Sequence, residues 1–181
     1  LVSQGSSGSD QRLLRALVLA LAALPADTKA VLKEHGLVGP ALQMLFRQSM
    51  AGIETDADYL SGRAHPSAFE GAAIDLERLI RRAAALPADA VPPAVRLHVR
   101  AVPEAPGAIF ADGLSERLFD TPAAIARIAR GTAGTRRWRV SAAGTADPSG
   151  RALRFHWRVL RGPGVRVTPL DETGTQAFIE V

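Results

Sequence analysis

Cysteine is absent from this chain of 181 residues, and Lys29 and Lys33 are its only lysines. Without cysteine the chain forms no disulfide framework, no cysteine-ligated zinc or iron–sulfur site and no thiol catalyst. Aromatic residues are scarce, at 5%, whereas apolar residues make up 47% of the chain. That apolar content argues against wholesale disorder, and the length suits one ordinary domain or two small ones with hydrophobic cores.

Long hydrophobic runs are also missing. The apolar run Ala16 to Leu24 has nine residues, and a membrane-spanning helix needs roughly 20, so we expect no transmembrane segment. Arg12 and Arg15 before this run imitate the start of a secretory signal peptide, but the helical spacing of its leucines favours a buried helix. Because the chain begins without Met and ends in an expected strand, we interpret it as part of a longer protein.

Charge is distributed unevenly along the chain. Residues 1–126 carry 12 basic and 14 acidic side chains, a net charge of −2, whereas residues 127–181 carry 10 basic and 4 acidic side chains, a net charge of +6. Such a basic segment attracts an anionic partner, such as nucleic acid, a phosphorylated or sulfated glycan, lipid headgroups or an acidic protein. Arginine enrichment in a GC-rich genome is the alternative explanation.

Helical periodicity dominates the first half of the sequence. Leu13, Leu14, Leu17, Val18 and Leu21 recur at helical spacing. Residues 52–71 lose this periodicity and predict a long loop, a kind of segment that often carries function. Prolines, glycines and polar residues set the helix boundaries, and the further helices are expected from Asp27 or Thr28 to Gly36, from Pro40 onward and from Ile74 to Leu86.

From residue 95 the apolar residues recur with a period of two, as in half-buried strands. The alternating apolar positions are Val95, Leu97 and Val99, then Trp138 and Val140, then Phe155, Trp157 and Val159. Two further strands are expected near 165–168 and 176–181, and residues 103–113 form a connector. The segment 122–130 suits either a helix that starts at Asp120-Thr121-Pro122 or a strand.

Three stretches of the second half follow one another along the chain and together carry a family resemblance: VSAAGTADPSG at 140–150, LRFHW at 153–157 and LRGPGV at 160–165. Asp147-Pro148-Ser149-Gly150 has the chemistry of a tight turn, and Trp157 can fill the space between two thin sheets. This pattern resembles PKD-type immunoglobulin-like domains over residues 122–181. The resemblance implies an antiparallel β-sandwich in an exported bacterial protein, periplasmic or extracellular.

We therefore predict an α+β protein with a helical N-terminal part and a small Ig-like β module. The expected divisions are 1–93 for the helical part, 94–121 for a strand and connector, and 122–181 for the β module, truncated at its C-terminus. The first 120 residues resemble no family that we can name.

Basic residues occupy the polar side of three expected strands. Alternation places each group on one side of its strand, and pairing of the strands at 137–139 and 154–158 would align their guanidinium groups for bidentate contact with carboxylate, sulfate or phosphate. A solvated face, or docking against Glu70, Asp75 and Glu77, is the alternative. The candidate binding residues are Arg139, Arg154, His156 and Arg158, together with Arg96, His98 and Arg100.

Other candidate chemistry is weaker. Asp58, Tyr59 and His65 lie close enough in sequence to form an acid–base group. Glu54, Asp56 and Asp58 do not match a calcium-binding EF-hand, because Ser61 and Ser67 occupy the positions that require Gly and Glu. The histidines lack metal-ligand spacing, and residues 5–9 lack the lysine of a phosphate-binding loop. We expect no metal and no cofactor.

The sequence thus predicts a non-catalytic interaction module of a larger exported protein. Its expected partner is an anionic polysaccharide or an acidic protein surface rather than nucleic acid. The alternatives are a hydrolase whose loop 54–66 contributes to an active site, and a purely structural spacer.

Overall fold

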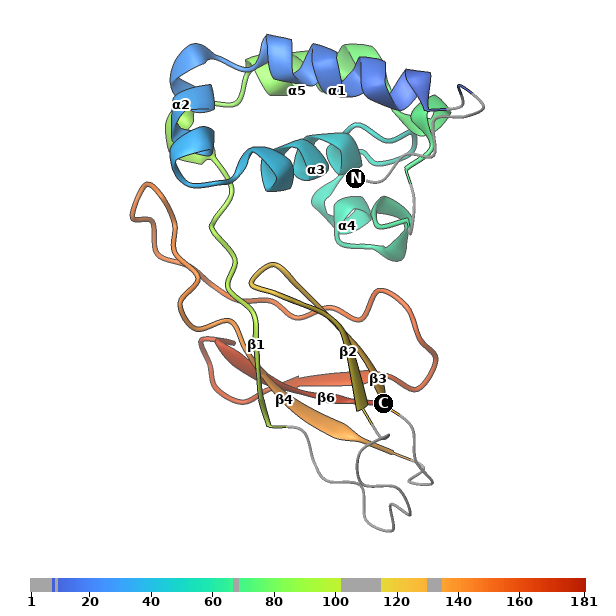
Figure 1. Ribbon diagram of the computed structural model, residues 1–181, viewed down its shortest axis with the longest axis vertical. Coiled ribbons are helices and arrows are strands. Elements are labelled where there is room, and N and C mark those ends of the chain that lie inside the picture. The colour runs from blue at the N-terminus through green and yellow to red at the C-terminus, as the bar shows by residue number, and fades with distance from the viewer. Residues whose placement is uncertain (1–7, 9, 67–68, 102–114, 130–134) are drawn as a thin grey trace. The chain divides into compact units, whose positions relative to one another are not determined.

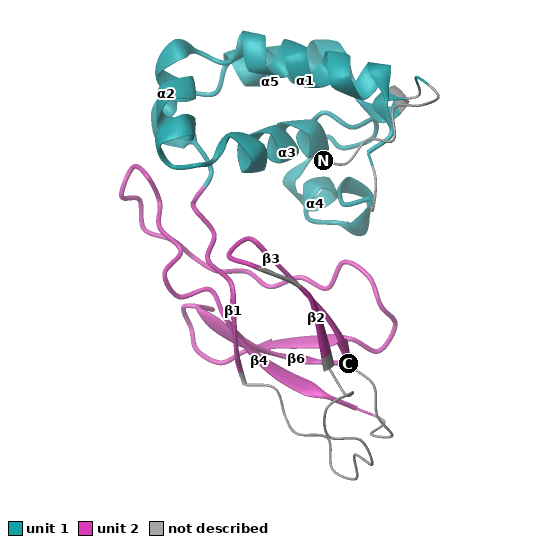
Figure 2. Ribbon diagram, in the orientation of Figure 1, with its two compact units in different colours: residues 1–92 teal, residues 93–181 magenta. Residues whose placement is uncertain are grey.

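The computed structural model describes residues 8, 10–66, 69–101, 115–129 and 135–181. The chain divides into two compact units, Leu1–Pro92 and Pro93–Val181 (Figure 2). Helices make up the first unit and antiparallel strands the second (Figure 1), so the predicted α+β class is confirmed. Within the described ranges, no helix is both long enough and apolar enough to cross a membrane.

Four of the five α-helices described in the first unit lie close to their predicted positions, and the short helix Asp56–Tyr59 lies within the predicted loop. Gly36, at a φ of 67°, follows the second helix, and the Asp75 side chain accepts a hydrogen bond from the Arg78 amide at the start of the last one. That last helix is shorter than predicted at both ends. The helices are α1 (Gln11–Ala23), α2 (Ala26–Glu34), α3 (Val38–Gln48), α4 (Asp56–Tyr59) and α5 (Leu76–Ala84).

Helix α1 buries Ala16 and Ala20 more deeply than its leucines, of which Leu13, Leu17 and Leu21 are half-buried. Ala16 and Ala20 are fully buried, whereas Leu14 and Val18 are 47% and 63% exposed. Because α1 is apolar on nearly every side, the leucine spacing predicts the helix correctly but identifies its buried side only in part. Small residues allow close packing, and α1 and α5 lie side by side (Figure 1).

The core of the first unit lies among these helices. Its fully buried large side chains include Leu32, Leu45, Phe46 and Leu79, and the Phe46 ring meets the Phe69 ring edge-on at 5.7 Å between centroids. Each such side chain stabilises the fold by about 1.5–3 kcal/mol through burial.

The segment 52–71 is more ordered than the predicted loop. It contains α4 and a turn of 3₁₀-helix at Gly62–Ala64. Thr55 and Asp58 form a capping box at the start of α4, in which each side chain bonds to the other residue's backbone amide. Two more 3₁₀ turns lie at Gly71–Ala73 and Ala88–Ala90.

The second unit contains a four-stranded antiparallel sheet in the order β1-β4-β6-β5 and a separate hairpin, β2-β3. The predicted strands near 138–140, 165–168 and 176–181 are confirmed, and the expected connector at 103–113 lies outside the described residues. The strands are β1 (His98–Ala101), β2 (Ser115–Thr121), β3 (Ala124–Ala129), β4 (Arg137–Ser141), β5 (Arg166–Pro169) and β6 (Gln176–Glu180).

The helix predicted to start at Asp120-Thr121-Pro122 is wrong, and the alternative of a strand is correct. Pro122 and Ala123 form the turn between β2 and β3. The Thr121 hydroxyl accepts a hydrogen bond from the Ala124 amide and donates one to the Ala124 carbonyl, both at 3.1 Å. Residues that suit a helix start also suit a tight turn, and here the turn is favoured by strand pairing.

The strand predicted at 155–159 is also wrong. Residues 151–160 have no regular secondary structure, and β4 pairs with β1 and β6 instead. Both edges of β4 are therefore occupied, so the pairing of 137–139 with 154–158 does not form. The segment is held by the Phe155 amide, which donates to the Thr173 carbonyl at 3.3 Å, and by the Trp157 indole, which donates to the Gly174 carbonyl at 2.6 Å.

Candidate anion-binding face

One face of the four-stranded sheet collects basic side chains. Residues paired across neighbouring antiparallel strands project to the same side, so Arg137, Glu180 and Arg166 lie in one row. Arg139 and Phe178 follow in the next row, and Ser141 is paired with Gln176 and with His98 in the last. We call the side bearing Arg100, Arg137, Arg139 and Arg166 the arginine face.

Arg100 reaches this face at an irregularity of β1. The register with β4 shifts between Val99 and Ala101, so Arg100 is the extra residue of a bulge opposite Arg139. Arg100 and Arg139 line one open cavity of about 300 Å³ together with Ser141, Ala143 and Gln176. The bulge therefore brings guanidinium groups from two strands to one cavity.

Only part of the positive charge on this face is neutralised. Arg137 forms an ion pair with Glu180 at 3.2 Å, and its guanidinium lies over the Phe178 ring at 5.1 Å from the centroid. In the described part of the chain, Arg100, Arg139 and Arg166 have no acidic partner. All four arginine side chains are exposed, so three guanidinium groups remain accessible to an anion.

Hydrogen bonds position the polar side chains of the cavity. The Arg139 Nε donates to the Gln176 Oε1 at 3.1 Å, and the Ala143 amide donates to the Ser141 Oγ at 3.1 Å. Ser141 is only 1% exposed and lies at the base of the cavity. The fixed geometry of these groups favours recognition of one defined chemical group over diffuse attraction alone.

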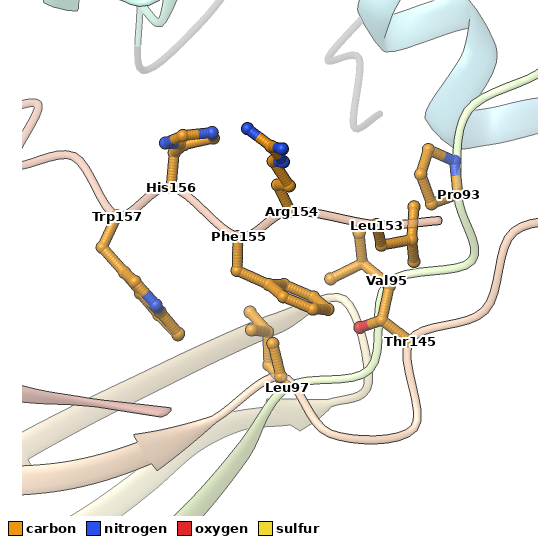
Figure 3. A pocket seen from close by; sticks show the side chains of 10 residues that line it. Pro93, Val95, Leu97, Thr145, Leu153, Arg154, Phe155, His156 and Trp157 are labelled. Carbon is orange, nitrogen blue, oxygen red and sulfur yellow. The ribbon is translucent and has the colours of Figure 1, made fainter. Parts of the chain in front are cut away.

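The predicted binding residues Arg154, His156 and Arg158 are separate from this cavity. Figure 3 shows that Phe155 and Trp157 point toward Leu97, whereas Arg154 and His156 point away. The alternation in the sequence therefore predicts correctly which side chains of this segment point inward and which point to solvent. All three basic side chains are exposed. Residues 153–157 line a second cavity of about 270 Å³, with Pro93, Val95, Leu97, Ala142 and Thr145.

The two cavities lie on opposite sides of the sheet. Ala142 lines the cavity beneath Phe155, whereas its neighbours Ser141 and Ala143 line the cavity of the arginine face. Successive residues of an extended chain face opposite sides. The structure thus brings together His98, Arg100 and Arg139 from the predicted set, and places Arg154, His156 and Arg158 elsewhere.

Arg96 lies before β1, outside the arginine-face rows defined above. Its backbone amide donates to the Thr145 Oγ1 at 3.0 Å, and the side chain is exposed. The neighbouring Leu97 amide donates to the Pro122 carbonyl at 2.6 Å. These contacts attach the segment before β1 to the 145 loop and to the β2-β3 turn.

Of the candidate acid–base residues of the first unit, Tyr59 and His65 are in contact, whereas the Asp58 carboxylate has other partners. The His65 Nε2 lies 2.8 Å from the Tyr59 carbonyl oxygen, and the two rings meet at 5.5 Å between centroids. The Asp58 carboxylate accepts hydrogen bonds from the Glu54 and Thr55 amides and pairs with the Arg63 guanidinium. Asp58 thus braces α4 and the following turn.

The pKa values of these groups follow from their surroundings. The Thr55 hydroxyl, aided by neighbouring amides, lowers the pKa of Asp58. Burial raises the pKa of Tyr59 and lowers the pKa of His65, with the Tyr59 carbonyl partly opposing the latter shift. At neutral pH the cluster therefore holds an ionised Asp58 and a neutral His65.

Three of the acidic side chains weighed in the sequence as oxygen ligands or docking residues have partners inside the first unit. Glu54 pairs with Arg78 at 2.6 Å, Asp75 caps α5, and Glu77 lies 3.9 Å from Arg81. Across the described segments, no group of three His, Asp or Glu side chains is arranged to hold a metal ion.

Four residues of the arginine face are missing from the predicted set, and one of them, Arg137, lies on the same side of β4 as the predicted Arg139. Ser141 shares the phase of Arg139 two positions earlier, so alternation alone identifies its side of the strand. Gln176 and Arg166 reach the face through the pairing of β6 with β4 and β5, and no local pattern specifies that register. Comparison with protein-family models, curated proteins and solved structures finds no match to this chain.

Proposed function

We propose that the second unit is a non-catalytic module that binds an anionic glycan through the arginine face. The observation that carries this proposal is the set of four exposed arginines on one sheet face with a single glutamate, Glu180, among them. Guanidinium groups bind carboxylate and sulfate in bidentate geometry. A polyanion matches such an array better than a single small anion does.

The spacing of the array supports a polymer with repeated charges. Arg137 and Arg139 are two residues apart on β4, which separates them by roughly 7 Å along the strand. Arg100 and Arg166 extend the face across the sheet, where neighbouring strands are about 4.8 Å apart. A polymer with repeated anionic groups can contact several of these arginines at once. It therefore binds more tightly than its separate monomers do.

The charge of the whole unit supports the same partner. Residues 93–181 carry 13 basic and 8 acidic side chains, a net charge of +5. A field of this sign raises the local concentration of a polyanion and accelerates its association. An acidic protein surface is the competing partner, and the test below includes it.

The remaining proposals rest on the resemblance of residues 140–165 to PKD-type immunoglobulin-like domains. We infer from it that the second unit is an Ig-like module and that it works in the periplasm or outside the cell, as part of a larger protein. The antiparallel sheet and the inward-pointing Phe155 and Trp157 are compatible with such a module.

Heparin chromatography of the purified chain tests the proposed function. We expect retention that falls with added salt, because screening weakens contacts between exposed charges. Arg100→Ala, Arg139→Ala and Arg166→Ala should each elute at lower salt than the unmodified chain. Arg82→Ala is the matched control, since it removes one exposed arginine from α5 of the first unit and should elute later than the three face variants.

Two results would overturn the proposal. One is an absence of salt-sensitive retention, and the other is an equal shift for Arg82→Ala and the face variants, which would indicate net charge without a defined site. Stronger retention on polyglutamate than on heparin would assign the face to an acidic protein instead.

A further inference from the structure

The cavity of the arginine face presents hydrogen-bond donors, and its two side-chain acceptors already hold a bond. We propose that it is a subsite for a sulfate ester of the glycan, bound by Arg100, Arg139, Ser141 and Gln176. This inference rests on the proposed function and specifies the chemical group that the site recognises.

The orientation of Gln176 follows from its partner. The Nε of an arginine can only donate a hydrogen bond, so the Gln176 atom that faces it at 3.1 Å is the amide oxygen. The Gln176 amide nitrogen, with two hydrogens, is therefore left to donate into the cavity that the residue lines. The same contact uses only the Nε of Arg139, so its two Nη groups are left to donate to a ligand.

Ser141 contributes a further donor at the base of the cavity. Its Oγ already accepts a hydrogen bond from the Ala143 amide, and a hydroxyl group also has one proton to donate. The side chain is 1% exposed, so a ligand that accepts this proton also shields the bond from water. A hydrogen bond formed away from water contributes more than an exposed one.

Arg100 completes the donor set from the neighbouring strand. It lines the same cavity and has no acidic partner among the described residues. The guanidinium groups of Arg100 and Arg139 therefore supply positive charge, while Ser141 and Gln176 supply neutral donors. Both side-chain oxygens in the cavity, Gln176 Oε1 and Ser141 Oγ, already accept a hydrogen bond.

Converging donors discriminate between oxyanions. A sulfate ester carries three terminal oxygens and no proton near neutral pH, so it accepts from donors that converge from several directions. A carboxylate offers two oxygens in one plane and satisfies fewer of these donors. A phosphate monoester takes up a proton near pH 6, which removes one negative charge and turns one of its oxygens into a donor that faces the donors of the cavity.

Titration of the full-length chain with three small probes tests the proposal. The probes are methyl sulfate, methyl phosphate and acetate at matched ionic strength, and the readout is the NMR signal of the Ala143 backbone amide, which lines the cavity and is retained in every variant. We expect methyl sulfate to shift this signal at both pH 7.5 and pH 5.5, and acetate to bind roughly tenfold more weakly. Methyl phosphate should lose affinity relative to methyl sulfate as the pH falls.

The sulfate arm controls for titration of the protein itself. Among the described residues, His98, paired with Ser141, and Glu180, in the outer row, are the titratable groups of this face besides the arginines. Only the phosphate gains a proton between the two pH values. The sulfate arm therefore measures any change in the protein, and the phosphate arm is compared with it.

Variants locate the subsite. Gln176→Glu preserves the shape of the side chain but replaces two donors with a carboxylate, and should weaken methyl sulfate binding by roughly tenfold or more. Ser141→Ala should weaken it severalfold, and Arg82→Ala should leave it unchanged. An unchanged far-ultraviolet circular dichroism spectrum shows that each variant is folded.

The outcomes separate this inference from the proposed function. Retention on heparin together with equal binding of acetate, or with no effect of Gln176→Glu, overturns the sulfate subsite and leaves the proposed function intact. A third outcome is that Gln176→Glu abolishes methyl sulfate binding but the chain is not retained on heparin. This outcome supports the sulfate subsite and overturns the proposal that the sulfate belongs to a glycan polymer.

Discussion

The two units differ in how they treat their apolar side chains. The described residues include 19 buried apolar side chains, and of these only Val140, Ala142 and Ala177 belong to the second unit. Of the nine exposed large apolar residues in the described ranges, six belong to that unit, among them Leu118 at 58% and Val159 at 42%. The helical unit is thus built around a core, and the β unit around a sheet with two accessible faces.

This difference follows from how each kind of element buries apolar surface. A helix buries one stripe against its neighbours, and the packing of several helices encloses a core. A single sheet requires a second layer on its apolar face, and in the second unit the segment 153–157 supplies part of it through half-buried Phe155 and Trp157. The first unit is therefore expected to account for most of the chain's resistance to unfolding.

The largest expected effect comes from the core of the first unit. Phe46 is fully buried, so Phe46→Ala should lower the free energy of unfolding of that unit by about 3–5 kcal/mol. Chemical denaturation followed by helical circular dichroism measures the change, and Val18→Ala at an exposed position of α1 should change it by less than about 0.5 kcal/mol. Simultaneous loss of the NMR signals of the β unit in Phe46→Ala would show that the two units do not fold independently.

A smaller effect is expected where the segment 153–157 meets the sheet. Gly174 has a φ of 68°, and a Cβ there would run into the Phe155 carbonyl oxygen. Backbone strain alone typically costs about 1–3 kcal/mol. Gly174→Ala should therefore lower the free energy of unfolding of the β unit by more than this, and it should displace Trp157. Gly164→Ala is the matched control, because Gly164 has a φ of 84° but no atom within 4 Å of the added Cβ.

Denaturation followed by tryptophan fluorescence compares the two glycine variants. If the two variants had the same denaturation midpoint, the close approach of Gly174 to Phe155 would contribute nothing to the stability of the β unit. The unit would then depend on its four-stranded sheet alone.

The smallest expected effect concerns pH. Burial lowers the pKa of His65 in the first unit, so the unfolded chain binds a proton more readily than the folded chain does below about pH 6.5. The free energy of unfolding of that unit should therefore be greatest above this pH and fall as the pH decreases toward the lowered pKa. Thermal unfolding between pH 7.5 and pH 5 measures the loss, and His65→Gln should abolish it.

The β unit should respond in a more acidic range. The Arg151 side chain lowers the pKa of Asp147, and the Thr173 hydroxyl lowers the pKa of Asp171. The stabilisation from these carboxylates is present above the unfolded pKa of about 4 and is lost as the pH falls through their lowered values. If the stability of wild type and of His65→Gln depended equally on pH above pH 5, the expected difference in pH response between the two units would be contradicted.

Local sequence patterns predict the elements better than they predict the contacts between them. The helical spacing of residues 13–21 identifies α1, but neighbouring helices select its buried side, on which Ala16 and Ala20 are fully buried and Leu14 and Val18 do not lie. Phe155, Trp157 and Val159 alternate as the residues of β4 do, yet only β4 is paired. Alternation specifies which side chains face inward, whereas pairing depends on a partner strand that is distant in sequence.

The same limit applies to the candidate site. Arg139 and Arg100 are identified from alternation within their own strands, and the bulge that seats Arg100 at the cavity is invisible in the sequence. Gln176 is uncharged and lies 37 residues from Arg139, so only the register of β6 reveals that it belongs to the site. Charge identifies candidate binding residues along the chain, and the pairing of the strands determines which of them lie on one face.

The bulge at Arg100 has a consequence for solubility. β1 is an edge strand of the sheet, and an edge with regular spacing invites the strand of another molecule to add to it, which leads to aggregation. The shifted register and the charged Arg100 make β1 a poor template, and at the opposite edge Pro169 removes one backbone donor from β5. Both edges of the four-stranded sheet thus discourage growth by strand addition, even though its faces remain open to solvent.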